Sequence, residues 1–407
     1  MEYTIKTINE LCTKITDGSH FSPEHDENGV YPMYSSKDML YDGFDDSDVK
    51  RISEPVYKKL VKQDCRPLKN DILIIKDGNS YLKRIFKINT DIDAVILSSI
   101  AILRPNVKII DPDFFKYLLR SDSIRNAMAN YVSGAAIPRI VLKDFKKMKL
   151  EFISSMKAQQ KIASILSAYD NLIQNYKKQI EALQIAASEL YKEWFVRFRF
   201  PGWQNAKFEN GIPEGWSICR LKDFGKVITG KTPPTEIEEY YGGDIMFVKT
   251  PDMHGNMFVQ STSEYLSKLG CEYQKAQYLP ENSIMVSCIG TGGITAINAY
   301  PANTNQQINS IILADKKYLP WLYFTVSNMK ETIEMFGNTG TTMTNLSKGK
   351  FEKLKVVKPE YSIIQIFENK VSPLFEQIKN LNKQITNLTQ QRDLLLPRLM
   401  SGKLEVE

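Results

Sequence analysis

Two segments of the chain carry a long stripe of apolar residues at alternating spacings of four and three. In the first segment the stripe has ten positions, and all ten are apolar. Such spacing is typical of an α-helix that buries one narrow face along its whole length. A helix of about 35 residues spans roughly 50 Å, so we expect a rigid rod. The positions are Ile162, Leu166, Tyr169, Ile173, Tyr176, Ile180, Leu183, Ala187, Leu190 and Trp194.

The second segment repeats this stripe 205 residues later. The pair Gln179-Ile180 recurs there as Gln384-Ile385, and only Arg392 breaks the apolar pattern. A 3.5-residue repeat of this length favours a supercoiled pair, so the natural partner of each stripe is the other stripe. The alternative is that each helix packs on its own globular domain. The positions are Phe367, Val371, Leu374, Ile378, Leu381, Ile385, Leu388, Arg392, Leu395 and Leu399.

Two prolines fall within the second stripe. Ser372-Pro373 either begins a new helix, as its N-cap and first turn, or kinks a helix that is already under way. Pro397 is expected to mark the fraying end of this helix.

Short runs rich in β-branched residues precede each predicted helix. The runs Asp71 to Ile75, Ala94 to Leu103, Ser283 to Ser287 and Ile308 to Leu313 are typical of strands and are separated by Gly, Asn, Asp and Pro turns. We therefore expect a β-rich α+β domain before each helix. The predicted boundaries are 1–153 and 199–360 for the domains, 154–198 for the first helix, and 361–407 for the second helix and the tail.

The two halves also resemble each other before the helices. ITDGSHFSP (15–23) matches ITGKTPP (228–234), DILIIKDG (71–78) matches NSIMVSCIG (282–290), and SSIAIL (98–103) matches NSIILA (309–314). Between these matches the halves diverge, with YSSKDMLYDGFDD in one and FVKTPDMHGNMFVQ in the other. A duplicated scaffold that carries two different sets of loops follows from this pattern.

Composition narrows the class of protein. The chain has 407 residues and a net charge of +6, which permits nucleic-acid binding without requiring it. The five cysteines form no CxxC pair, so neither a disulfide framework nor a zinc site is indicated. Because no apolar run reaches the ~20 residues of a membrane helix and MEYTIKTINE has no signal-peptide pattern, we expect a cytoplasmic protein.

Motifs for catalysis are weak. GKVITGKT (225–232) fits the pattern of a phosphate-binding loop, but RLKDF precedes it, two prolines follow it, and Val227-Ile228 is typical of a strand. Three histidines, His20, His25 and His254, offer little for a metal centre or a catalytic triad. We therefore expect no catalytic residue and no metal ligand in this chain; an autonomous enzyme that uses the GKT loop is the weakest hypothesis.

The order of motifs along the whole chain resembles the specificity subunits of type I restriction-modification systems. The matching motifs are KITDGSHFSP, SGAAIPRI, QQKIASILSAYDNLIQ, LYKEWFVRFRFPGW, PEGWSICRLKDFGKVITGKTPP, TGTTMTNLSKGKFEKLKVVKP and LLLPRLMSGKL.

The resemblance implies two pseudo-repeated target recognition domains separated by two long helices that form an antiparallel coiled coil. It implies that each domain reads one half of a bipartite site in double-stranded DNA and that two modification subunits dock on the helices. Restriction subunits would join later. S-adenosylmethionine, ATP and Mg are expected in those partner subunits and no cofactor in this chain. The alternative is a coiled-coil scaffold that binds protein and lacks DNA specificity.

Candidate DNA contacts follow from loops rich in basic, amide and hydroxyl side chains, since Lys and Arg meet phosphates and Asn, Gln and Arg read base edges. The lysine clusters Lys143 to Lys149 and Lys348 to Lys358 are candidates for phosphate contacts. The aromatic residues Trp194, Phe195, Phe198 and Phe200 are candidates for capping a domain-helix junction or, alternatively, for an interface with a modification subunit. The candidates are Ser35, Ser36, Lys37, Lys76, Asn79, Lys83, Arg84, Arg139, Lys143, Lys146 and Lys147 in the first half, and Lys249, Thr250, His254, Thr291, Asn305, Gln306, Gln307, Thr342, Asn345, Lys348 and Lys350 in the second.

Overall fold

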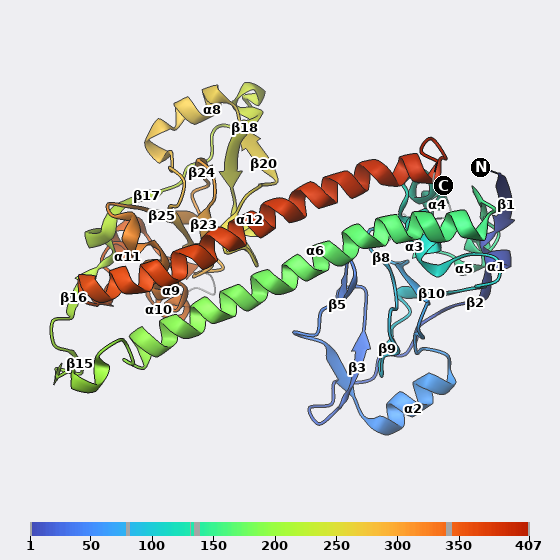
Figure 1. The fold of residues 1–407 in the computed structure, drawn as a ribbon, viewed down its shortest axis with the longest axis horizontal. Helices are drawn as coiled ribbons and strands as arrows, with labels where there is room; N and C mark the ends of the chain where they lie inside the picture. The colour runs from blue at the N-terminus through green and yellow to red at the C-terminus, as the bar shows by residue number, and fades with distance from the viewer. Residues whose placement is uncertain (1, 79–81, 131, 134–138, 339–343, 406–407) are drawn as a thin grey trace. The chain divides into compact units, whose positions relative to one another are not determined.

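The computed structural model describes residues 2–78, 82–130, 132–133, 139–338 and 344–405. The candidate residues Asn79 and Thr342 lie outside this range. The chain divides into two compact units: unit 1 comprises Met1–Ile173 and Asn387–Glu407, and unit 2 comprises Gln174–Thr386. Each of the two long helices therefore contributes one part to each unit (Figure 1).

The long helices are α6, Met156–Tyr191, and α12, Tyr361–Met400. A π-helical turn, η1, continues α6 over Lys192–Val196. Helix α12 passes through Pro373 without a break, so of the two alternatives the beginning of a new helix at Ser372 is wrong. Pro373 is exposed, and a proline on the solvent side of a helix loses only one backbone hydrogen bond without disturbing a packed face. Pro397 lies in the last turn of α12, near the end of the helix as expected.

The predicted seam is present in unit 1, where the two helices run in opposite directions. Close to the start of α6, the Tyr3 hydroxyl donates to the Met400 carbonyl at 3.4 Å. Tyr3 pairs with Ile153 in a short sheet just before α6 begins. Further along α6, Asp170 meets Arg392, eight residues earlier in α12. Ile162, Leu166, Leu395 and Leu399 belong to one apolar core between these points.

Unit 2 contains the other half of the seam. The rings of Tyr191 and Trp194 lie against Phe367 near the start of α12. Ile180 and Leu183 pack on the same core, which includes Val371 and Ile378. Helix α6 thus packs in the core of unit 1 at its start and in the core of unit 2 at its end. The alternative in which each helix packs only on its own globular domain is therefore excluded. The remaining seam residues Tyr169, Ile173, Tyr176, Leu190, Leu374, Leu381, Ile385 and Leu388 are buried or half-buried.

Unit 1 is built on a four-stranded antiparallel sheet in the order β2-β10-β7-β8. Ile72 and Ile74 of β7 point into the core that α3 and α6 cover, whereas Leu73 and Ile75 point into a second core on the other face. Burial on both faces explains why this strand is a continuous apolar run. The elements of the unit are β1 Tyr3–Thr7, α1 Ile8–Leu11, β2 Cys12–Asp17, β3 Tyr31–Tyr34, β4 Met39–Leu40, β5 Gly43–Phe44, β6 Lys50–Ile52, α2 Glu54–Lys62, β7 Ile72–Ile75, β8 Ile85–Lys87, β9 Val95–Ile96, β10 Ile100–Pro105, α3 Pro112–Arg120, α4 Asp122–Ala129, β11 Val132–Ser133, β12 Arg139–Ile140, α5 Leu142–Phe145 and β13 Lys149–Ile153.

Unit 2 has a five-stranded sheet in the order β17-β25-β21-β23-β19. Its elements between α6 and α12 begin after η1 with η2 Trp203–Asn205, β14 Phe208–Glu209, β15 Ile212–Pro213, β16 Ser217–Arg220, η3 Leu221–Phe224, β17 Gly225–Thr229, η4 Glu238–Tyr240, β18 Tyr241–Val248, α7 Thr250–Met253, β19 Phe258–Val259, β20 Glu264–Leu266, α8 Lys268–Tyr273, η5 Lys275–Gln277, β21 Ile284–Ser287, β22 Ile289–Gly290, β23 Thr295–Asn298, β24 Ala302–Thr304, β25 Ile308–Leu313, η6 Lys316–Tyr318, α9 Leu319–Ser327, α10 Lys330–Gly337, β26 Thr344–Asn345, α11 Lys348–Phe351 and β27 Lys355–Lys358.

The predicted duplication is confirmed by strand order. The order β2-β10-β7 in unit 1 recurs as β17-β25-β21 in unit 2, and β6-β3-β9 recurs as β20-β18-β24. In both smaller sheets the central strand has one antiparallel and one parallel neighbour. A pair that joins the beginning and the end of each domain, β1-β13 or β16-β27, completes the repeat. The predicted run Ala94 to Leu103 is two strands, β9 and β10, and not one.

Equivalent glycines, Gly18 and Gly230, directly follow the equivalent strands β2 and β17. Gly18 and Gly230 donate from their backbone nitrogens to Ile100 and Ile308 at 3.3 and 3.0 Å. A Cβ would lie 2.0 Å from the Ile96 carbonyl oxygen at Gly18 and 2.2 Å from that of Asn305 at Gly230, so only glycine fits. The GKVITGKT segment is thus a strand followed by this close approach of two backbones, and not a phosphate-binding loop.

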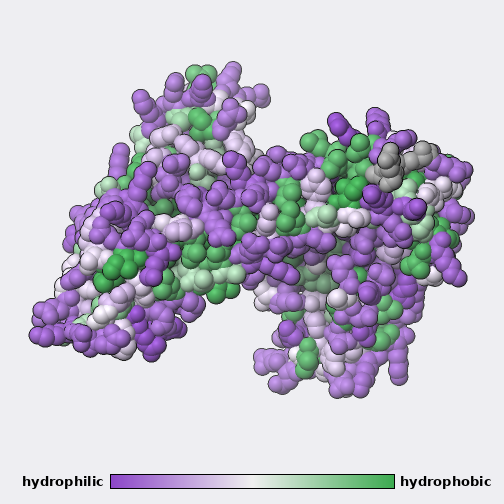
Figure 2. All heavy atoms as spheres, viewed as in Figure 1, coloured by the Kyte–Doolittle hydropathy of each residue, from purple (hydrophilic) through white to green (hydrophobic). Residues whose placement is uncertain are grey.

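The surface in view is largely hydrophilic, with apolar residues in small groups (Figure 2). Within the described residues, we find no helix that combines the length and the apolar character required to span a membrane.

Candidate nucleic-acid interface

The first candidate loop of unit 1 follows β3 and is held by its own aspartate. The Asp38 carboxylate accepts hydrogen bonds from the Ser35 backbone nitrogen and hydroxyl at 2.7 and 2.8 Å. The Ser36 backbone nitrogen donates to the Ser99 hydroxyl at 3.1 Å, which ties the loop to the turn after β9. Lys37, whose side chain is 63% exposed, lies within 3.5 Å of Asp48. The loop therefore presents hydroxyl and ammonium groups from a fixed backbone.

A group of charged side chains lies beside this loop, at the ends of β2 and β7. Lys76 is 4% exposed, and its ammonium lies 3.2 Å from Asp17 and 3.3 Å from Asp77. Arg139 also pairs with Asp77, at 3.1 Å, but its side chain is 58% exposed. Lys76 is thus committed to internal ion pairs, whereas Arg139 has donors that face solvent. His20, 3.3 Å from Asp17, joins the group and was not among the candidates.

The structure does not bring all candidates of unit 1 together at these loops. Arg84 is half-buried and donates to the Met39 carbonyl, and Lys83 lines a cavity beside Arg120 and Arg392. The lysine cluster that contains Lys143, Lys146 and Lys147 lies on and after α5. The Lys146 carbonyl accepts a hydrogen bond from the Asn9 backbone nitrogen in α1. Helix α1 precedes the first residue of β2, whereas Gly18 follows the last, so this lysine cluster lies at the other end of β2 from the candidate loops.

Unit 2 repeats the first loop with different side chains. The Asp252 carboxylate accepts from the Lys249 backbone nitrogen at 2.9 Å, as Asp38 accepts from Ser35. The Thr250 hydroxyl donates to the Gln307 side-chain oxygen at 3.3 Å, in the place of the bond between Ser36 and Ser99. Each loop is followed by a buried methionine, Met39 or Met253. The Asp-Met pair in both loops was the sequence signal for this equivalence, which the comparison of the halves missed.

Amide side chains gather at the turn after β24. The Asn305 amide nitrogen donates to the Gln307 side-chain oxygen at 3.1 Å, and the Thr232 hydroxyl donates to the Gln306 side-chain oxygen at 2.6 Å. Asn305 is 8% exposed, Gln307 is half-buried and Gln306 is exposed. The Thr232 hydroxyl thus holds the side-chain oxygen of Gln306, while the Gln306 residue is exposed to solvent.

The turn that contains Thr291 lies beside these amides. The Cys288 backbone nitrogen donates to the Gln307 carbonyl at 2.7 Å, and the Ser287 hydroxyl donates to the Thr291 carbonyl at 2.7 Å. Strand β22 then pairs Ile289 with Asn345, which is exposed. The candidates Thr250, Thr291, Asn305, Gln306, Gln307 and Asn345 are therefore brought together at one end of the sheet in unit 2.

The remaining candidates of unit 2 lie around this end. His254 is exposed and ends α7. Lys348 and Lys350 lie on α11, which buried Phe351 anchors; Lys348 is 3.6 Å from Glu352, and Lys350 donates to the Phe336 carbonyl at 3.4 Å. Within the described residues, no group of three or more His, Cys, Asp or Glu side chains could hold a metal ion.

The aromatic cluster after α6 belongs to the core of unit 2. Trp194 and Phe200 are buried, and Phe195 and Phe198 pack against the same core, which includes Trp216. Phe195 contacts Phe367 edge-on with ring centroids 4.9 Å apart. The predicted domain-helix junction is therefore confirmed.

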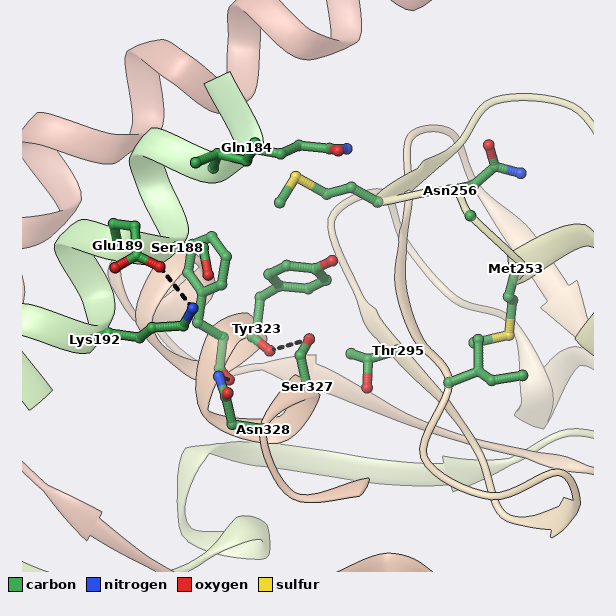
Figure 3. Close-up of a pocket in the computed structure, with 15 residues that line it drawn as sticks. Gln184, Ser188, Glu189, Lys192, Met253, Asn256, Thr295, Tyr323, Ser327 and Asn328 are labelled. Atoms are coloured by element: carbon green, nitrogen blue, oxygen red, sulfur yellow. Dashed lines mark hydrogen bonds and ion pairs between the residues drawn. The ribbon is translucent and has the colours of Figure 1, made fainter. Parts of the chain in front are cut away.

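A cavity of about 520 Å³ lies beside this junction in unit 2 (Figure 3). Gln184 and Ser188 of α6 line one side, and Asn328, which follows α9, lines another. The Lys192 ammonium is held 2.7 Å from the Glu189 carboxylate, and the Ser327 hydroxyl donates to the Tyr323 carbonyl. Gly255 and Asn256, just beyond the loop of Lys249 and Thr250, complete the wall.

Comparison with known proteins identifies the family. The type I restriction modification DNA specificity domain matches residues 1–184 and 213–390. The chain belongs to this family. It is the DNA-specificity subunit of a type I restriction-modification system, as the resemblance predicted.

Relatives of this specificity subunit cover most of its length. The HindI specificity subunit of Haemophilus influenzae is 31% identical over an alignment of 405 positions, which covers 83% of this chain and 87% of the relative. The MjaIX specificity subunit of Methanocaldococcus jannaschii is 31% identical over an alignment of 305 positions, which covers 72% of this chain and 69% of the relative. The crystal structure of a type I S subunit from M. genitalium matches with a TM-score of 0.60 at 17% identity, covering 100% of this chain and 97% of that one, and so has the same fold.

Proposed function

We propose that the loop end of each unit reads one half of a bipartite DNA site and that the two half-sites differ in sequence. The main support for this proposal is that the two units share one backbone scaffold but carry different side chains on its loops. The bond between Ser36 and Ser99 in unit 1 has its counterpart in the bond between Thr250 and Gln307 in unit 2. Equivalent loops would approach equivalent places on two half-sites, while hydroxyls in one unit and amides in the other would select different bases.

The candidates divide into two roles in this proposal. Arg139 and the lysine clusters on α5 and α11 supply positive charge for phosphates, which contributes affinity without sequence preference. Ser35, Ser36 and Lys37 in unit 1, and Gln306 and Asn345 in unit 2, supply donors and acceptors for base edges. Lys76 acts indirectly in this proposal, since its ion pairs with Asp17 and Asp77 fix the loops around it.

The two long helices would set the distance between the half-sites and carry two modification subunits, with restriction subunits joining the assembly. Methyl transfer and ATP-dependent cleavage would then take place in those partners, with this chain as a non-catalytic component. A protein-binding scaffold without DNA specificity is the second candidate, but it gives no reason for amide and hydroxyl groups to gather at the same end of both units.

Mapping methylated bases tests the proposal. Co-expression of this chain with its modification and restriction partners is expected to produce methylation at one bipartite motif, and omission of this chain to abolish it. Methylation that is independent of this chain, or that follows no bipartite motif, would exclude the proposed function.

Loss of two exposed amides should weaken reading of the second half-site. We expect the double substitution Gln306→Ala and Asn345→Ala to reduce affinity for the methylated motif by at least about 30-fold, since each of two good base contacts contributes about 1–3 kcal/mol. Binding to unrelated DNA should change little because phosphate contacts remain. Fluorescence anisotropy with the assembled methyltransferase measures both. Gln204→Ala, at an exposed glutamine in η2, is the matched control; equal losses in the two variants would remove these amides from the proposed interface.

A further inference from the structure

The one polar residue of the apolar seam, Arg392, belongs to a buried charged cluster in unit 1. Its guanidinium donates to the Asp170 carboxylate at 2.7 Å. Tyr117 donates to the same carboxylate at 2.6 Å, and Lys116 and Arg120 of α3 each lie 3.4 Å from it. Asp170 is 5% exposed, and Lys116, Arg120 and Arg392 are no more than 8% exposed. One carboxylate therefore joins α6, α12 and α3.

This cluster is bonded to the tip of the β4-β5 hairpin. Arg120 donates to the Tyr41 carbonyl at 2.7 Å and to the Asp42 carboxylate at 2.6 Å. The Tyr41 ring lies under two guanidinium groups, with that of Arg120 4.0 Å and that of Arg392 4.8 Å from its centroid. The tip is thus fixed to α12 as well as to α3.

The base of the same hairpin is the first reading loop. Asp38, which holds Ser35, immediately precedes β4, and its carbonyl accepts from the Asp45 backbone nitrogen at 2.8 Å after β5. Phe44 of β5 stacks on Tyr34 of β3 with ring centroids 3.8 Å apart. Two short strands therefore connect the reading loop to the charged cluster, and a shift of the tip would move the base.

Unit 2 shows that the fold does not require the cluster. The positions 205 residues from Asp170 and Arg392 in the repeat are Phe375 and Ala187, both buried. Phe375 packs against Phe324 of α9 with centroids 5.9 Å apart. Gly255, two residues after Met253 as Tyr41 is two residues after Met39, borders the cavity in Figure 3. In place of a charged cluster, unit 2 joins α12 to its loop region by apolar and neutral contacts: Phe375 lies edge-on to Phe258 of β19 with ring centroids 5.4 Å apart, and the Gln260 amide donates to the Lys379 carbonyl at 2.8 Å.

Burial of a charged cluster contributes little net stability compared with apolar packing, so its retention in one unit alone indicates a positional role. We propose that Arg392 and Asp170 are positioning residues for base reading by unit 1: through Arg120 and Tyr41 they hold the first reading loop in a fixed place on the helices. This inference rests on the proposed function and assigns the charged tether, with Arg392 and Asp170, to the half-site of unit 1 only.

Substitution Arg392→Leu tests the tether because it restores the apolar seam and leaves Lys116, Arg120 and Tyr117 on Asp170. In the assembled methyltransferase, we expect about tenfold more methylation of sites with one wrong base in the half-site of unit 1, as when one base contact is lost. Discrimination at the other half-site should be unchanged. Arg392→Lys should relax discrimination less, because its ammonium can still bond the Asp170 carboxylate although it lacks the guanidinium group that lies over the Tyr41 ring. Arg398→Leu, at an exposed arginine of α12, is the matched control.

The outcomes separate this inference from the proposed function. If the wild-type chain directs no bipartite motif, the proposed function fails. If the motif is present and Arg392→Leu retains full discrimination at both half-sites, or relaxes both equally, the tether is refuted. Should Arg392→Leu fail to fold, Tyr41→Leu cuts the connection at the half-exposed hairpin tip and carries the same expectation; unchanged discrimination in that variant refutes the tether as well.

Discussion

Replacing Asp170 by alanine is expected to lower the free energy of unfolding of unit 1 by about 3–5 kcal/mol, the usual cost of removing one partner from a buried ion pair. The substitution leaves Lys116, Arg120 and Arg392 without the carboxylate that they share. Burial by itself raises the pKa of Asp170, but the charge of Lys116 and the hydrogen bonds from Tyr117 and Arg392 outweigh it, so the pKa lies below 3.8. Burial and Arg120 lower the pKa of Lys116.

The stabilisation has a defined pH dependence. Because the pKa of Asp170 is lower in the folded chain than its ordinary value of 3.8, the stabilisation is fully present above about pH 4 and is lost as the pH falls through the folded pKa. The difference in stability between the wild type and Asp170→Ala should therefore shrink in acid.

The two units can be followed separately. All four tryptophans, Trp194, Trp203, Trp216 and Trp321, lie in unit 2. Hydrogen exchange of α3 and of the first half of α6 should show the loss in unit 1, while the fluorescence transition of unit 2 shifts less. Asp393→Ala is the matched control, since Asp393 also bonds Arg392 but its side chain is 58% exposed, and its loss should cost less than about 1 kcal/mol. Equal losses of stability in the two variants would contradict the claim that the Asp170 carboxylate is the main anionic partner in the buried charged cluster.

The sequence predicted the helices well because their periodicity is a local property that persists over ten positions. It could not explain Arg392, whose partner Asp170 lies 222 residues away and becomes a neighbour only when the helices pair. The same reason applies to Lys76. It was expected to face DNA as a basic residue in a turn, but Asp17, from another strand, lies beside it and takes up its charge.

The sequence indicated which segments contain the reading loops, but it did not indicate how the backbone and side chains of these loops are arranged. Loops rich in basic, amide and hydroxyl side chains, between the matching strand motifs, indicated where they lie, but the divergent sequences of these loops hid that Asp38 and Asp252 have the same role. Lys83 and Arg84 follow β7 on the same stretch of chain as Lys76, yet Lys83 lines the cavity beside Arg120 and Arg392, and Arg84 donates to the Met39 carbonyl. The conformation of a short segment depends on residues that are distant in the sequence. The spacing of residues in the sequence therefore does not indicate whether a side chain faces the loop end or the helices.

Exchange of the first domain should have the largest effect on specificity. If residues 1–153 are replaced by the matching segment of another family member, the reading loops of unit 1 change while β16 to β27 and both helices remain. One half of the methylated motif should then be replaced entirely. The other half, and the number of base pairs between them, should stay as in the wild type because the reading end of unit 2 and the helices are unchanged.

Sequencing that detects methylated bases in cells with the exchanged chain and its modification partner is the most direct test of two independent reading units. We expect a new bipartite motif that shares one half-site and the spacing with the wild-type motif. A motif altered in both half-sites, or in neither, would contradict it.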